Sequence, residues 1–168
     1  LDLFEEVAKF RAFRQIWANL AKNRFGAKNA KAMQARIVFY SGGSHLTRSQ
    51  PYINIARTTI QALSAALGGV QIMNLSSFDE AYQTPSQESS TIAVRIQQIL
   101  GYETGISKTI DPLAGSYYIE TLTKKIEKGV VDYLEKIEKM GGAIKAIESP
   151  FPEVQDESFT DGAFIRNR

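Results

Sequence analysis

The fold follows from one stretch of the sequence, Gly68-Gly69-Val70-Gln71-Ile72-Met73-Asn74-Leu75-Ser76-Ser77-Phe78-Asp79-Glu80-Ala81. Its two glycines predict a turn, and the apolar run that follows them predicts a short buried strand. Ser77 and Glu80 have the spacing of a capping box, which predicts that a helix starts there. Polar side chains gather where the strand ends, and this end of a strand is where parallel α/β proteins hold their ligands.

The residues on both sides of this stretch repeat the same order of strand, loop and helix. Upstream, a β-branched and aromatic strand at 36–41 precedes Gly42-Gly43, and a helical period returns over 52–67. Downstream, Thr84-Pro85-Ser86-Gln87 predicts a helix capped by Thr84 and running to about Leu100. A strand at 108–111 and a long helix at 117–140 follow.

An apolar helical face also precedes the first strand, with Leu3, Val7, Phe10, Phe13, Trp17 and Leu20 spaced by three and four residues. Alternating strands and helices favour an α/β protein with parallel strands. Three strands are too few for a closed eight-unit barrel. We therefore expect either a small open α/β domain or part of a (β/α)8 barrel over residues 1–148. Residues 149–168, rich in acidic side chains and prolines, are expected to form an extended tail.

Composition excludes several classes of function. The net charge of +2 is too small, and the basic residues too scattered, to indicate a nucleic-acid or membrane-surface partner. The chain of 168 residues has no cysteine, which fits a cytoplasmic protein and excludes thiolate chemistry. No apolar run reaches the ~20 residues that span a bilayer. The chain begins without methionine, which suggests a fragment or a processed protein.

Few residues suggest chemistry on their own. Glu80, at a helix start beside a strand end, either caps its helix or accepts a hydrogen bond from a ligand hydroxyl. Tyr40 is equally suited to a buried core and to a site in which its phenol donates a hydrogen bond. His45, the only histidine, lies in a polar loop without a partner for a triad or a metal site. Taken alone, these residues indicate an α/β domain with strand ends suited to a ligand.

Longer motifs carry a resemblance to a known family. They are Phe10-Arg11-Ala12, Arg57-Thr58, Gly69-Val70-Gln71, Ser77-Phe78-Asp79-Glu80-Ala81, Glu103-Thr104-Gly105, Asp111-Pro112-Leu113-Ala114-Gly115-Ser116-Tyr117 and Met140-Gly141-Gly142-Ala143-Ile144-Lys145-Ala146-Ile147-Glu148. From about Phe4 to Glu148 the chain resembles the C-terminal part of the substrate-binding barrel of methylmalonyl-CoA mutase and related acyl-CoA mutases. The resemblance implies the last three βα units of a TIM barrel, preceded by a helix.

The resemblance also implies a function. Enzymes of this family use adenosylcobalamin to isomerise the carbon skeleton of an acyl-CoA through radicals. The implied partners are an acyl-CoA substrate, the remaining barrel segment and a cobalamin-binding subunit, because the cobalt-ligating domain is absent from this chain. Open sheet edges further predict a homo-oligomer. The isolated chain is expected to be inactive.

Site residues follow by position. Glu80 matches a glutamate near the adenosyl ribose, Ala81 adjoins the corrin, and Gly43 and Ser44 match a loop that touches the corrin. The remaining residues assigned to the cofactor by the resemblance are Tyr40, Gln71 and Ser76. Those assigned to the substrate are Val38, Tyr40 and Asn74. No catalytic or metal-binding residue is assigned.

Four of these positions depart from the family pattern. Val38 replaces a histidine that contacts the substrate, Tyr40 a glutamine, Asn74 a histidine and Ser76 an asparagine. Removing a buried polar interaction without replacing it costs about 1–3 kcal/mol, so we expect a different acyl group or weakened activity. The main alternative is a non-catalytic half-barrel that self-associates or scaffolds a mutase partner. A small-ligand-binding α/β module is a third hypothesis.

Overall fold

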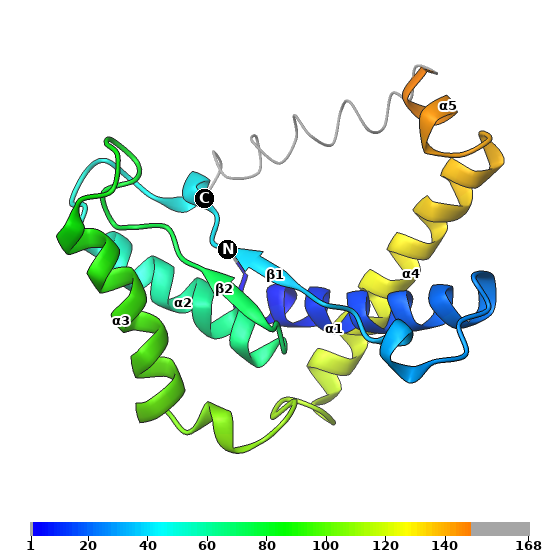
Figure 1. Cartoon of the computed structure of the whole chain (residues 1–168), viewed down its shortest axis with the longest axis horizontal. Helices are drawn as coiled ribbons and strands as arrows, with labels where there is room; N and C mark the ends of the chain where they lie inside the picture. Colours follow the sequence, from blue (N-terminus) through cyan, green and yellow to red (C-terminus); the bar gives the residue numbers. More distant parts are fainter. Residues whose placement is uncertain (1, 149–168) are drawn as a thin grey trace. The chain divides into compact units, whose positions relative to one another are not determined.

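A computed structural model of the chain describes residues 2–148, and the tail expected at 149–168 lies outside them. The major helices are α1 (Leu3–Asn19), α2 (Ile53–Leu67), α3 (Gln87–Glu103), α4 (Tyr117–Lys139) and α5 (Ala143–Glu148). Short helical turns are η1 (Leu20–Arg24), η2 (Ala30–Met33), η3 (Gly43–His45) and η4 (Ile106–Lys108). The strands in the described part are β1 (Val38–Tyr40) and β2 (Ile72–Asn74) (Figure 1).

The sheet confirms the α/β class. Strands β1 and β2 pair in parallel, with Tyr40 opposite Asn74, and α2 forms the connection between them. Successive side chains of a strand point to opposite faces. Phe39 and Met73 therefore share one face, where they pack against Phe10 of α1 and Ala65 of α2. A second cluster joins Ala62 of α2 to Ile96 and Leu100 of α3.

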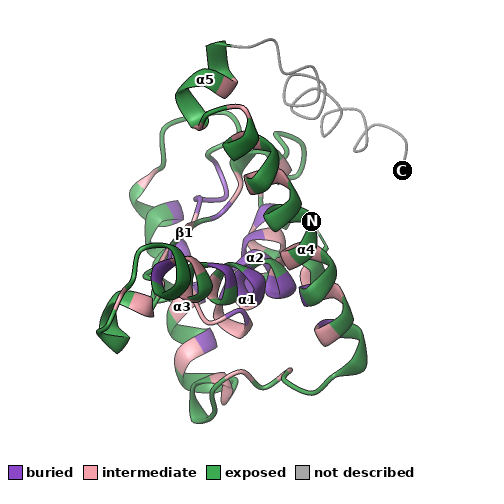
Figure 2. Ribbon diagram, turned by 90° about the vertical axis from the view of Figure 1, so that its right-hand side faces the viewer, coloured by how far each residue is buried: buried purple, intermediate pink, exposed green. Residues whose placement is uncertain are grey.

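Helices α1 and α2 approach each other closely through small residues. Ala8, Ala12, Ala62 and Ala65 are fully buried, and Figure 2 shows buried residues gathered on these two helices. Gly68 is required here, because a Cβ at this position would lie 2.8 Å from the Phe10 ring. The apolar face expected for α1 was partly wrong, since Phe13 and Trp17 are 47% and 44% exposed while Ile16 is buried. The buried residues of α1 are instead Val7, Ala8, Phe10, Arg11, Ala12 and Ile16.

Three expected elements differ in the structure. No helix starts at Ser77, because residues 78–82 form turns. Helix α3 is capped by the side chain of Ser86 rather than by Thr84, and it continues past Gly101 to Glu103. The expected strand at 108–111 is absent from the described residues, which form η4 and bends there. Asp111 has a φ of 50°, which is incompatible with an extended strand.

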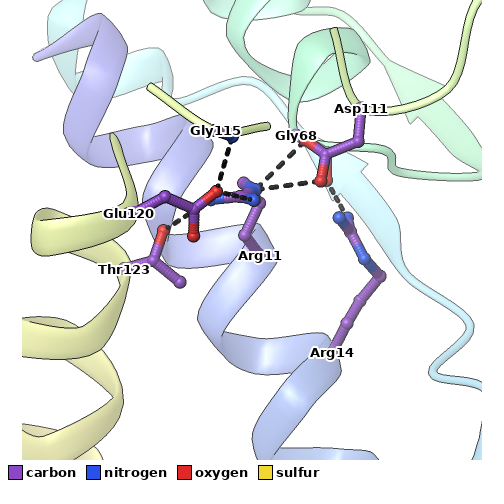
Figure 3. Close-up of polar contacts among 7 residues, drawn as sticks. All are labelled: Arg11, Arg14, Gly68, Asp111, Gly115, Glu120 and Thr123. Atoms are coloured by element: carbon purple, nitrogen blue, oxygen red, sulfur yellow. Dashed lines mark hydrogen bonds and ion pairs between the residues drawn. The ribbon is translucent and has the colours of Figure 1, made fainter. Parts of the chain in front are cut away.

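A buried arginine explains the backbone at Asp111. The Nε of Arg11 lies 3.1 Å from both carboxylate oxygens of Asp111, and Nη2 donates to Glu120 at 2.7 Å. Nη1 donates to the hydroxyl of Thr123 at 3.1 Å (Figure 3). These bonds hold the loop before α4 and the first turns of α4 against α1. The bond to Glu120 and the neighbouring Asp111 raise the pKa of Arg11 despite its burial.

Arg14, one helical turn after Arg11, donates to the carbonyl oxygen of Gly68 (Figure 3). Burial lowers the pKa of this guanidinium. The contact satisfies a carbonyl at the end of α2, where the helix itself offers no donor. Arg11 and Arg14 thus connect α1 to both α4 and α2.

The chain divides into two units between Glu127 and Lys128. The sheet, α1, α2 and α3 all belong to the first unit. The described part of the second unit holds the end of α4 and the short helix α5, in which Ile144 and Ile147 are exposed. The long helix expected at 117–140 and the helical turn expected at 143–148 are confirmed.

Candidate functional site

The face of the sheet opposite the helices carries three residues that the sequence assigned to the substrate. Val38 and Tyr40 lie on this face of β1 and are 50% and 71% exposed. Asn74 is the register partner of Tyr40 and is also exposed. The structure therefore brings Val38, Tyr40 and Asn74 together on one surface, with the phenol and the carboxamide side by side at the carboxyl ends of the strands.

The two strand ends are joined by a pair of serines. The backbone N–H of Ser76 donates to the hydroxyl of Ser41 at 2.6 Å, and the hydroxyl of Ser76 donates to the carbonyl of Ser41 at 3.0 Å. Both serines are buried. Ser76 thus lies beside the expected site, but its hydroxyl proton is already used within the protein.

The loops that follow the strands meet at Gly43 and Glu80. A methyl group built on Gly43 would lie 3.5 Å from a carboxylate oxygen of Glu80. The Glu80 carboxylate is exposed and accepts no hydrogen bond from another described residue. It does not cap a helix, as the spacing from Ser77 had suggested, because no helix follows. Ser44 and Ala81 are exposed on the same two loops.

Gln71 lies apart from the other expected site residues. It precedes β2, roughly 10 Å along the extended chain from Asn74. Its carboxamide accepts from the N–H of Ile37 at 2.7 Å and donates to the carbonyl of Gly69 at 2.8 Å. Gln71, Arg14 and Arg36 border a cavity of about 450 Å³ at the amino ends of the strands. The structure thus places Gln71 at the opposite end of the sheet from Tyr40 and Glu80.

Sequence reasoning missed the residue next to Glu80. Asp79 is fully buried, and its Oδ2 accepts from the side chain of Gln83 at 2.9 Å and from the N–H of Ser86 at 3.0 Å. Burial disfavours its charged form, but hydrogen bonds from Gln83, Ser89 and Ser86 outweigh that cost and lower the pKa from 3.8 to about 2. Asp79 therefore fixes the loop and leaves Glu80 available to a ligand.

The sequence left open whether Asn54 of α2 faces solvent or a neighbouring segment. Its side chain is fully buried, and it contacts both loops that follow the strands. The helical period over 52–67 gave no reason to choose it, because a buried asparagine on an apolar face has no distinguishing spacing.

Further features of the described residues bear on the kind of ligand that they could hold. His45 lies beside Ser44, with 3.5 Å between its Nδ1 and the serine hydroxyl. Residues 2–148 contain no group of three or more histidine, cysteine, aspartate or glutamate side chains placed to hold a metal. No helix in this part of the chain is long and apolar enough to cross a membrane. The arrangement instead offers a glycine-lined backbone, a phenol, a carboxamide and a free carboxylate to an uncharged or hydroxyl-bearing ligand.

The chain is similar to known proteins over nearly its whole length. The family model for methylmalonyl-CoA mutase matches residues 1–161. The 2-hydroxyisobutanoyl-CoA mutase large subunit of Aquincola tertiaricarbonis is 43% identical over 167 residues, which are 99% of this chain and 30% of that protein. Methylmalonyl-CoA mutase of Escherichia coli is 43% identical over 153 residues, which are 91% of this chain and 21% of that protein.

The human mitochondrial methylmalonyl-CoA mutase is 39% identical over 157 residues, which are 94% of this chain and 21% of that protein. This chain therefore spans less than a third of the length of each of these relatives. The match nevertheless extends over nearly all of this chain, including both loops of the candidate site. The chain belongs to the methylmalonyl-CoA mutase family.

Proposed function

We propose that this chain forms the C-terminal part of the substrate-binding barrel of an adenosylcobalamin-dependent acyl-CoA mutase. The observation that carries the proposal is the meeting of the Gly43 loop and Glu80 at the carboxyl ends of two parallel strands. Ligands of parallel α/β proteins bind at these ends. The activity would belong to the assembled protein, of which this chain supplies one part.

The partial barrel is supported by the β1–α2–β2 unit. Its strands are parallel, and α1, α2 and α3 cover only one face of the sheet. The other face exposes Val38, Tyr40 and Ile72. In a closed barrel, the face opposite the helices is the interior. The additional length of the relatives is sufficient to supply the missing strands.

The residues present fit a bulky cofactor with a ribose group. Gly43 has no side chain, so its backbone is open to close approach, and the exposed Glu80 carboxylate beside it can accept hydrogen bonds from hydroxyls. We propose that Glu80 binds the adenosyl ribose and that Gly43, Ser44 and Ala81 line the corrin. When bound, adenosylcobalamin supplies the radical that begins the rearrangement. The protein residues orient the groups and exclude water.

Tyr40 and Asn74 are proposed to orient the substrate. The phenol donates one hydrogen bond, and the carboxamide both donates and accepts, so together they suit the thioester carbonyl and a polar acyl substituent. Val38 adds an apolar wall on the same face. Compared with the histidine and glutamine usual in the family, this pair accommodates a different acyl group. Gln71, bonded to backbone at the opposite end of the sheet, is proposed to contact a more distant part of the ligand.

One observation favours a second function. Val38 and Ile72, both apolar and 50% and 56% exposed, stand side by side on the uncovered face. Such a surface also suits a half-barrel that self-associates without catalysis. The two functions differ in whether the Glu80 loop binds the cofactor.

Calorimetric titration with adenosylcobalamin distinguishes them. The chain would be combined with the remaining barrel segment and the cobalamin-binding subunit, then compared with Glu80→Ala. Loss of a hydrogen bond to a charged group costs about 1.5–3 kcal/mol, so we expect the dissociation constant to rise roughly 10- to 100-fold. Glu103→Ala, an exposed residue at the end of α3, is the control and should not change it. Absence of binding in the unmodified assembly would favour the non-catalytic half-barrel.

A further inference from the structure

One buried side chain bonds to both loops of the candidate site. Asn54, near the start of α2, is 0% exposed. Its Nδ2 donates to the carbonyl of Thr47 at 2.8 Å and to the carbonyl of Phe78 at 2.8 Å. Its Oδ1 accepts from the N–H of Thr47 at 3.1 Å and from Arg57 at 2.9 Å. All of its hydrogen-bonding capacity is used.

The identity of these partners requires an amide. Two carbonyl oxygens face one side of the Asn54 side chain, and two N–H donors face the other. Only a carboxamide presents two donors and an acceptor within so small a volume. Aspartate would place an acceptor against two carbonyls, and leucine would leave the backbone groups of Thr47 and Phe78 without their partner.

Each bonded backbone group lies close along the chain to a residue of the candidate site. Thr47 follows Leu46, whose N–H donates to the carbonyl of Gly43 at 3.0 Å. Phe78 is two residues before Glu80. The rings of Tyr52 and Phe78, with centroids 5.0 Å apart, add a second contact between the same segments. Asn54 therefore links the segment that leads to Glu80 with the segment that follows the Gly43 loop.

We propose that Asn54 is a positioning residue, which holds the Gly43–Ser44 loop and the Glu80 loop in register so that both meet one ligand. The inference rests on the proposed function for the identity of that ligand. The mechanical part, namely that Asn54 holds the two loops in place, is testable without any ligand. Asn54 itself does not reach the ligand, because both loops cover it.

Hydrogen exchange tests the mechanical part on the chain without cofactor. The first variant is Asn54→Asp, which keeps the size of the side chain and its acceptor oxygen but removes the donor. The second is Asn54→Leu, which removes both the donor and the acceptor. The matched control is Ser64→Ala, since Ser64 is also a fully buried polar residue of α2 and its hydroxyl donates to the carbonyl of Gln61, within the same helix. We expect exchange at residues 42–50 and 76–83 to increase at least tenfold in both Asn54 variants, with α1 and α3 unchanged.

The proposal would be overturned if hydrogen exchange in the Asn54 variants increased equally throughout the chain. It would also be overturned if the two loops exchanged no faster in these variants than in Ser64→Ala. If Asn54→Leu fails to fold, Asn54→Asp decides the result alone, and if that variant also fails, Asn54→Ser is judged by the same criterion. Faster exchange confined to the two loops supports a positioning role, because a general loss of stability would also affect α1 and α3.

The second measurement concerns ligand binding in the complete assembly. We expect Asn54→Asp to weaken adenosylcobalamin binding about tenfold, and Ser64→Ala to leave it unchanged when both are compared well below their unfolding temperatures. If Asn54→Asp exchanges faster in the two loops but binds adenosylcobalamin with unchanged affinity, Asn54 has no role in ligand binding. If no variant and no unmodified protein binds the cofactor, the proposed function fails while the exchange result still decides whether Asn54 positions the loops.

Discussion

At the scale of single residues, neighbouring acids in the Ser77–Ala81 turn have opposite environments. Asp79 is fully buried and bonded to Gln83 and Ser86, whereas Glu80 is exposed. The sequence indicated Glu80 because of its family position and its spacing from Ser77. It held no sign of Asp79, because the partners of that carboxylate are a backbone N–H and side chains brought near by the turn. Burial of this kind depends on tertiary packing and has no periodic pattern.

The lowered pKa of Asp79 leads to a prediction about acid stability. Because the folded pKa of about 2 lies below the ordinary 3.8, the charged form stabilises the fold above pH 3.8, and this contribution is lost as the pH falls toward 2. We expect Asp79→Asn to be less stable than the unmodified chain at pH 7 and to lose less stability between pH 4 and pH 2. Urea unfolding across this range measures both effects. Asp132→Asn, an exposed residue of α4, is the control, and an Asp79→Asn curve parallel to it would contradict the assignment.

At the scale of elements, the start of α3 tests how the helix is capped. The hydroxyl of Ser86 accepts from the N–H of Ser89 at 3.1 Å, which makes Ser86 the cap in place of Thr84. Loss of such a cap costs about 1 kcal/mol. We therefore expect Ser86→Ala to lower the free energy of unfolding by about 1 kcal/mol, and Thr84→Ala to change it by less than about 0.5 kcal/mol. If chemical denaturation shows a larger loss of stability for Thr84→Ala than for Ser86→Ala, Thr84 is the cap, as the sequence predicts.

The contact between α4 and α1 depends on the hydrogen bonds of Arg11. The Arg11 side chain is 7% exposed, and Asp111 bonds its Nε through both carboxylate oxygens. Asp111→Ala leaves this buried guanidinium with one carboxylate partner, Glu120, and should cost about 1.5–3 kcal/mol. Glu88→Ala, an exposed acid of α3, serves as the control for removing one negative charge. An equal and small effect of both changes on urea unfolding would show that the buried contacts carry little of the stability.

Local sequence patterns were sufficient to locate two of the long helices and both strands. The helical periods over 52–67 and 117–140 were confirmed, as were the strands around Val38–Tyr40 and Ile72–Asn74. The strand expected at 108–111 was wrong, because the ion pair between Arg11 and Asp111 bridges segments 100 residues apart. The structure places Val38, Tyr40 and Asn74 on one face of the sheet through the strand register. It also places Gly43 beside Glu80. Their roles toward cofactor and substrate stay predictions.

At the scale of the whole molecule, the sheet has a covered face and an open one. The covered face packs on helices in the first unit. The open face exposes Val38, Tyr40 and Ile72, and each strand has one edge without a partner strand among the described residues. Unpaired edges and clustered apolar side chains favour association with another chain. In the proposed mutase, the remaining barrel segment covers this face, so the isolated chain should associate with copies of itself.

Light scattering at micromolar concentration tests this expectation, with an oligomer as the predicted result. Val38→Lys introduces a charge on the open face and should shift the chain toward monomer. Val94→Lys is the matched control, because Val94 on α3 is 52% exposed, close to the 50% of Val38, but lies away from the sheet. Association abolished in the first variant and kept in the second would locate the interface on the open face. A monomeric unmodified chain, or equal effects of the two lysines, would contradict it, because burial of the open face is then not what drives association.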